Sequence, residues 1–295
     1  MTATASHLDT WTAFLTGKDI PVMRSTVKAL DVARKRLHRI GVRDIADIVL
    51  KDPLMTLRVL RFVGLRRGKR QEQELANVEH AIIMIGVEPF FHHFARHDIV
   101  EDQLKPHPQA LLGLLRLVQR ARRSARYALD WAAWRQDLNC EEIAAAALMQ
   151  DIAAMLVHAL TPNKAAQLDN LGKTHPQASA AQRERAVLGT TLAELHARLC
   201  REWKLSALLA SLDDPGCAAQ PRVRNVRLAR DLAMHAAGGW DDPAIQPALE
   251  QDFQAIAALM SIDDATLRLR LGLQPRKAVE PDTPEEPRQA PGQGT

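Results

Sequence analysis

Residues 141–157 read EEIAAAALMQDIAAMLV, and this stretch decides the class of fold. Alanine, leucine and methionine make up most of it, and all three favour the helical conformation. The pattern predicts an apolar, alanine-rich helix over about 141–159. It holds one internal carboxylate, Asp151, directly after Gln150. An acidic side chain rarely lies in an apolar core without a partner, which raises the question whether Asp151 is a metal ligand of an enzyme or what remains of one.

Composition supports an all-α protein in a reducing compartment. The chain has 295 residues, of which 46% are hydrophobic, 25% charged and only 4% aromatic. No uninterrupted apolar run reaches the ~18 residues of a membrane-spanning helix, and the first residues lack the pattern of a signal peptide. Cys140, Cys200 and Cys217 form no zinc spacing. We therefore expect a cytoplasmic protein without a membrane segment.

Outside the opening stretch, further helices are marked by their starts and by apolar periodicity. Asp52-Pro53 is typical of a helix start, with an acceptor at the N-cap and proline at the first helical position. A long amphipathic helix is predicted over about 109–136, with arginines on one of its faces. Thr161-Pro162 is expected to end the helix that contains Asp151, and residues 163–182 read as a polar connector.

Several segments, taken in order, resemble the HDOD family. They are DIPVMRSTVKAL (19–30), RDIADIVLKDPLMTLRVLRFV (43–63), NVEHAIIMIGVEPF (77–90), EEIAAAALMQDIAAMLV (141–157) and ERAVLGTTLAELHARLCREWKLSALLASL (184–212). The chain departs from the family pattern at three places: Val63-Gly64 stands for Asn-Ser, Ala153 for Gly, and Asp213-Asp214 for a frequent His pair. The resemblance covers roughly residues 18–260.

The resemblance implies an all-α, HDOD/HD-like helical bundle with two helical lobes. The resemblance also implies that this fold is related to that of the HD-type metal-dependent phosphohydrolases. The expected organisation is an N-terminal helical extension (1–17), an HDOD-like domain (18–260) with an N-terminal lobe (18–105) and an HD-like lobe (106–260), a terminal helix (261–273) and a disordered tail (274–295). The tail is expected to be disordered because its Pro, Glu and Gln bury too little apolar surface to offset the ordering entropy.

The resemblance also places the former metal ligands of an HD phosphohydrolase. Gln150 stands where the His of the His-Asp pair would be, and Asp151 is that pair's carboxylate. The early His falls near Arg120 and the later Asp near Arg230. A fixed positive charge about 4 Å from a divalent ion costs several kcal/mol even at an effective dielectric constant near 20. We therefore expect no metal, no other cofactor and no catalytic residue, and we expect Arg120 to form an ion pair with Asp151.

Other candidate residues are basic, and each has an ordinary structural interpretation as well. Arg116, Arg120 and Arg123 lie on one helix and could bind a phosphate, although such a face is more often solvated. Arg66 and Arg67 lie in LRRGKR (65–70), which could contact a nucleic-acid backbone. Residues 21–70 hold fourteen Lys/Arg against four Asp/Glu, a balance that suits an acidic partner.

One further pair is taken as core packing. His196 and Cys200 are four residues apart on the apolar face of a predicted helix, and we do not expect them to act as a catalytic pair.

The function expected from the sequence is regulatory. We expect a non-enzymatic regulatory or scaffold protein of bacterial signal transduction that contacts a signalling protein. The alternatives are a pseudoenzyme that binds a nucleotide or phosphate at the arginine-lined former metal site, an active phosphohydrolase, and a regulator that binds nucleic acid.

Overall fold

The computed structural model describes residues 6–66, 77–94 and 98–273. Within these ranges the chain is helical throughout, and the only pairing between extended segments is a parallel bridge of Val22 with Ile99. The expected all-α class is therefore confirmed. The expected tail (274–295) and Arg67 lie outside the described residues.

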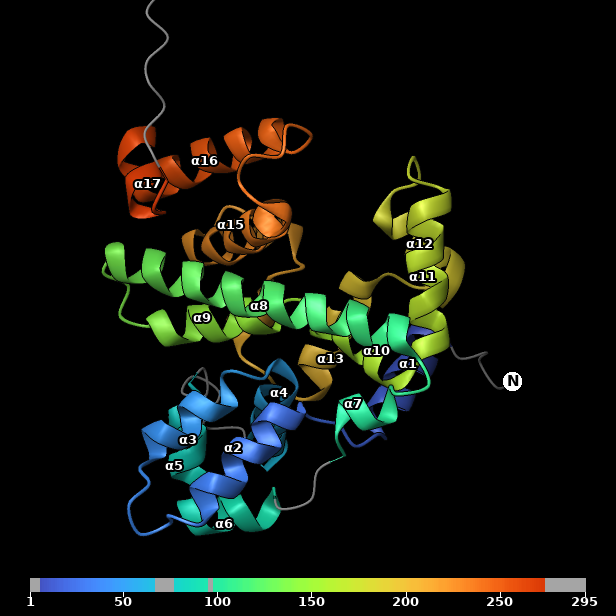
Figure 1. Cartoon of the computed structure of the whole chain (residues 1–295), viewed down its shortest axis with the longest axis vertical. Coiled ribbons are helices and arrows are strands. Elements are labelled where there is room, and N and C mark those ends of the chain that lie inside the picture. The colour runs from blue at the N-terminus through green and yellow to red at the C-terminus, as the bar shows by residue number, and fades with distance from the viewer. Residues whose placement is uncertain (1–5, 67–76, 95–97, 274–295) are drawn as a thin grey trace, which may run out of the picture.

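The helices form two lobes, each with its own hydrophobic core. The first lobe contains α2 Arg24–Arg34, α3 Val42–Val49, α4 Pro53–Arg66, α5 Val78–Ile85 and α6 Val87–His93. The second lobe contains α1 His7–Thr16, α7 Val100–Gln103, α8 Pro108–Trp134, α9 Cys140–Met149, α10 Ile152–Leu160, α11 Pro162–Thr174, α12 Ala180–Leu188, α13 Leu192–Glu202, α14 Ala207–Ser211, α15 Pro221–His235, α16 Gln246–Met260 and α17 Asp264–Arg270. Figure 1 shows α8 across the middle, with the first lobe on one side and α15 to α17 on the other.

The first lobe is organised around the start of α4. The Asp52 carboxylate is fully buried and accepts hydrogen bonds from the amides of Leu54 and Met55, which caps the helix. It also accepts from the Met23 amide and the Thr26 hydroxyl, both at 2.8 Å. Burial raises the pKa of Asp52, and these four donors oppose that rise. One side chain thus joins the start of α4 to the start of α2.

The second lobe is built on α8, which packs along α9, α10 and α15. Its buried face carries small side chains, among them Ala121 and Ala128, which allow the neighbouring helices to approach closely. The first helix, α1, packs on α13 and donates a hydrogen bond from the Trp11 indole to the Leu188 carbonyl. It is therefore an integral part of this lobe's core.

The prediction of a polar connector over 163–182 is wrong for most of that segment. Residues 162–174 form α11, with proline in its first turn. Ala165 is fully buried and Leu168 packs against the main core. These two apolar side chains, three residues apart, lie on one face of the helix, and Lys164 donates a hydrogen bond to the Val187 carbonyl.

The two lobes touch closely where α4 meets the end of α13. Gly64 lies so near the backbone of Trp203 and Lys204 that a Cβ atom would come within 2.3 Å of the Trp203 carbonyl oxygen. Arg61 of the same helix places its guanidinium 5.2 Å from the centre of the Trp203 ring. The Val63-Gly64 departure from the family pattern therefore lies at the lobe junction.

One helical stretch, Cys140–Leu160, passes a test of length and apolarity for a membrane span. However, 78% of its 18-residue apolar window is buried inside the protein, and the stretch is divided between α9 and α10. Packing in the centre of the second lobe accounts for its apolar character.

Candidate functional site

The site lies at the break between α9 and α10, where Gln150 and Asp151 form the connecting turn. The sequence predicted one helix over 141–159, and the structure divides it at these two residues. Met155 still donates its amide to the Asp151 carbonyl, so α10 starts immediately after the break. The turn directs the Asp151 side chain toward α8 and α15, where the two arginines of the former ligand set are found.

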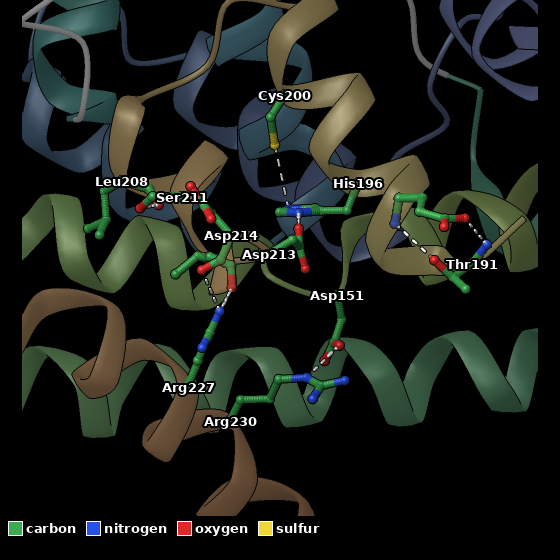
Figure 2. A network of polar contacts seen from close by, with 12 residues as sticks. Asp151, Thr191, His196, Cys200, Leu208, Ser211, Asp213, Asp214, Arg227 and Arg230 are labelled. Atoms are coloured by element: carbon green, nitrogen blue, oxygen red, sulfur yellow. Dashed lines mark hydrogen bonds and ion pairs between the residues drawn. The ribbon is translucent and has the colours of Figure 1, made fainter. Parts of the chain in front are cut away.

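Asp151 is held by both arginines. Its Oδ2 accepts from Nη2 and Nε of Arg120 at 2.8 and 2.9 Å, and its Oδ1 accepts from Nε of Arg230 at 2.8 Å. The expected ion pair of Arg120 with Asp151 is therefore present, and Arg230 completes a triad (Figure 2 shows Arg230 and Asp151). Burial would raise the pKa of Asp151, which is 7% exposed, but the charges of Arg230 and Arg120 outweigh it and lower that pKa.

The residues present do not fit the divalent metal of an HD phosphohydrolase. Both Asp151 oxygens already accept from guanidiniums, and a cation would have to displace two fixed positive charges. Gln150 offers an amide oxygen, which is a poor ligand for a transition metal; this atom is buried and no described residue bonds to it. Among the described residues, no three His, Cys, Asp or Glu side chains gather as candidate metal ligands.

A second polar cluster lies beside the triad, made by His196, Asp213 and Cys200. His196 Nδ1 bonds to the Asp213 carboxylate, and its Nε2 lies 3.6 Å from Cys200 Sγ (Figure 2). Both ring nitrogens thus have a partner within the protein. Because Cys200 is 1% exposed, a substrate cannot reach its thiol. The interpretation of His196 and Cys200 as core residues holds, but the sequence did not indicate Asp213 as the partner, which lies 17 residues further on.

Stability at high pH is expected to depend on this cluster. Burial opposes a charge on His196, but the Cys200 sulfur and the Asp213 carboxylate raise its pKa from 6.5 to about 10. The folded chain therefore keeps a proton that the unfolded chain releases. The resulting stabilisation is complete below pH ~6.5 and is lost as the pH rises toward ~10. Urea unfolding across this range should show a steeper decline for the wild type than for Asp213→Asn; equal slopes would contradict the assignment.

The triad and this cluster face one cavity of about 540 Å³. Arg120, Gln150, Asp151 and Arg230 all line it, so the structure brings together the four positions taken from the resemblance. Arg116 and Arg123 do not line this cavity. Arg66 lies in the first lobe, with its guanidinium 3.5 Å from the centre of the Phe62 ring.

Comparison with known families identifies the family to which the chain belongs. The family model described as "HDOD domain" matches residues 20–212. The chain belongs to the HDOD family. A search of curated proteins finds no match.

Two solved structures share the fold of this HDOD protein. The MmoQ response regulator from Methylococcus capsulatus str. Bath is 18% identical, with 86% of this chain and 98% of that chain covered and a TM-score of 0.62. A virulence factor from Campylobacter jejuni subsp. jejuni is 15% identical, with 92% and 94% covered and a TM-score of 0.63. At these identities the comparison establishes the helical fold alone.

Proposed function

We propose that this HDOD protein is a non-enzymatic regulatory or scaffold protein that acts in bacterial signal transduction through contacts with another protein. The single observation that carries the proposal is the saturation of Asp151 by Arg120 and Arg230. In an HD phosphohydrolase the metal activates water and polarises the phosphate. In this chain the Asp151 carboxylate, which would hold that metal, is paired with the guanidiniums of Arg120 and Arg230 instead.

The surroundings of the triad support a structural role for this former site. Asp151 joins the turn between α9 and α10 to α8 and α15, the helices on which the second lobe is built. The name of one structural relative, a response regulator, is consistent with a signalling role. The three cysteines are free thiols, which suits a cytoplasmic location.

The triad also bears on the two alternative functions that are not enzymatic. A nucleotide or phosphate at the former metal site would compete with Asp151 for the same two guanidiniums, which weakens that alternative at this position. Arg66, a candidate contact for nucleic acid, stacks on Phe62 of its own helix, and nothing in the described part of the first lobe favours nucleic-acid binding over an ordinary basic surface.

Metal binding and hydrolysis test the proposal directly. The purified wild-type chain is incubated with Mn²⁺, desalted and analysed for metal, and then assayed with bis(4-nitrophenyl) phosphate. We expect substoichiometric metal and no hydrolysis above the protein-free rate. The matched variant R120H/Q150H/R230D restores the donor types of an HD site and should retain more Mn²⁺ than the wild type. Stoichiometric metal or metal-dependent turnover in the wild type would overturn the proposal.

The partner is tested separately. The tagged full chain is used to capture proteins from its native cell, and each retained candidate is purified and titrated against the chain. Direct binding of a signalling protein, with no change in its covalent state, is the expected result. A retained protein that is dephosphorylated or otherwise converted by the chain would instead show that the chain is an enzyme.

A further inference from the structure

The arginine face of α8 is divided between two different environments. Arg116, Arg120 and Arg123 recur at steps of four and three residues and so share one side of the helix. Arg120 turns to Asp151. Arg123 donates from Nη1 to the Ala236 carbonyl at 3.0 Å, which leaves its charge without a carboxylate among the described residues. Arg116 has no hydrogen bond or ion pair within the part of the chain that the structure describes.

Arg116 and Arg123 face a second cavity, which adjoins the one that Asp151 lines. The two cavities share four lining residues: Leu117, Arg120, His158 and Asp169. The second cavity measures about 630 Å³ and lies between α8, α11 and the end of α15. Lys173, from the last turn of α11, supplies a third unpaired cation. Asp169 is the only acidic side chain among the described residues that line it, and its Oδ2 lies 3.9 Å from Nε2 of His158. Positive charge is therefore concentrated around one hollow.

The other side chains that line the cavity indicate which chemical groups a ligand could carry besides its negative charge. Gln109 and Gln119 offer amide groups for hydrogen bonds, while Leu112 and Met234 are large, exposed apolar side chains. Of the described residues that line the cavity, none is Phe, Tyr or Trp, so the row of large aromatic rings on which bases stack in a site for single-stranded nucleic acid is missing. The volume falls within the range of about 300–1,000 Å³ that is typical of small-molecule sites.

We propose that the cavity between α8, α11 and α15 binds a small molecule that carries two or more phosphate charges, with Arg116, Arg123 and Lys173 as its cationic contacts. Three like charges that face one hollow repel one another, and a multivalent anion relieves that repulsion. Arginine suits phosphate because its planar guanidinium donates two parallel hydrogen bonds. The proposal does not depend on whether the chain is an enzyme.

Pyrophosphate is the probe for this site, because it carries the charge of the ligand without its organic part. The full chain is titrated calorimetrically at a physiological ~0.15 M salt, where the Debye length is about 8 Å and attraction from distant charges is screened. We expect saturable binding, and weaker binding of inorganic phosphate and sulfate. Arg116→Gln and Lys173→Gln each remove an exposed charge and should weaken pyrophosphate binding about tenfold.

Arg126→Gln is the matched control, because Arg126 is an exposed arginine on the same helix that does not line the cavity. It should bind pyrophosphate like the wild type, and thermal unfolding of every variant verifies that it is folded. Four results would overturn the proposal. These are an absence of saturable pyrophosphate binding, an equal loss of binding in Arg126→Gln, sulfate binding as tight as pyrophosphate binding, and binding of duplex DNA that needs Arg116 and Lys173 without pyrophosphate binding.

Discussion

Asp151→Ala is expected to lower the free energy of unfolding by about 3 kcal/mol. Removing one partner of a buried ion pair typically costs about 3–5 kcal/mol, because the remaining charge stays unpaired. The lower value applies here because the side chains of Arg120 and Arg230 remain 22% and 34% exposed. Urea unfolding followed by circular dichroism measures the change. Asp169→Ala is the control: its carboxylate is 47% exposed and 3.9 Å from His158, so its loss should cost less than about 0.5 kcal/mol.

A second variant separates the cost of leaving Arg120 and Arg230 unpaired from the cost of losing the packing of the Asp151 side chain. Replacing the triad with apolar side chains of similar length, as D151L/R120M/R230M, removes the positive charges together with the carboxylate. Apolar replacement of a complete buried ion pair is often neutral or stabilising, so this variant should recover most of the stability that Asp151→Ala loses. Wild-type stability in Asp151→Ala would show that the triad does not hold α8, α10 and α15 together.

Gly64→Ala is expected to destabilise the protein by about 3 kcal/mol or more. The added Cβ would lie 2.3 Å from the Trp203 carbonyl oxygen and 3.0 Å from that of Lys204. Overpacking usually costs about 1–3 kcal/mol, and the upper end applies because both obstacles are backbone atoms rather than side chains that could rotate away. Since α4 and the end of α13 belong to different lobes, relief of the overlap would have to move one lobe against the other.

Gly172→Ala is the matched control for this substitution. Gly172 lies within α11, and a Cβ there would meet nothing within 4 Å. Alanine is a better helix former than glycine, so Gly172→Ala should stabilise the protein by about 0.5–1 kcal/mol. Calorimetric unfolding of both variants measures the contrast. Similar changes in the two would mean that the lobes are not in contact at Gly64.

Part of the site could be anticipated because its chemistry is local. An apolar helix with one carboxylate needs a partner for that charge, and the family pattern pointed to Arg120 as its source. Because an arginine stands where the family's ligand histidine would be, we expect Arg120 to form an ion pair with Asp151. The structure contains this ion pair. Arg120 and Arg230 could be placed only through the resemblance, because 31 and 79 residues separate them from Asp151.

Other features depend on helix packing and left no local signal. The sequence places Arg116, Arg120 and Arg123 on one face of a helix, but not the helices that each side chain meets. α11, read from its polar composition as a connector, supplies Lys173 and a wall of the second cavity. Asp213 reaches His196 only because the turn after α14 returns to α13.

The amino-acid sequence was enough to determine the helical class, the capped start of α4 and the approximate course of the long helices. These properties follow from propensity, capping and a period of 3.6 residues, which act between residues close in the chain. The three-dimensional packing decided that Arg120 and Arg230 together neutralise Asp151, that Arg116 and Arg123 have no carboxylate partner among the described residues, and that residue 64 has no room for a side chain. Those outcomes depend on distances between helices that are far apart in the chain, and no local pattern encodes them.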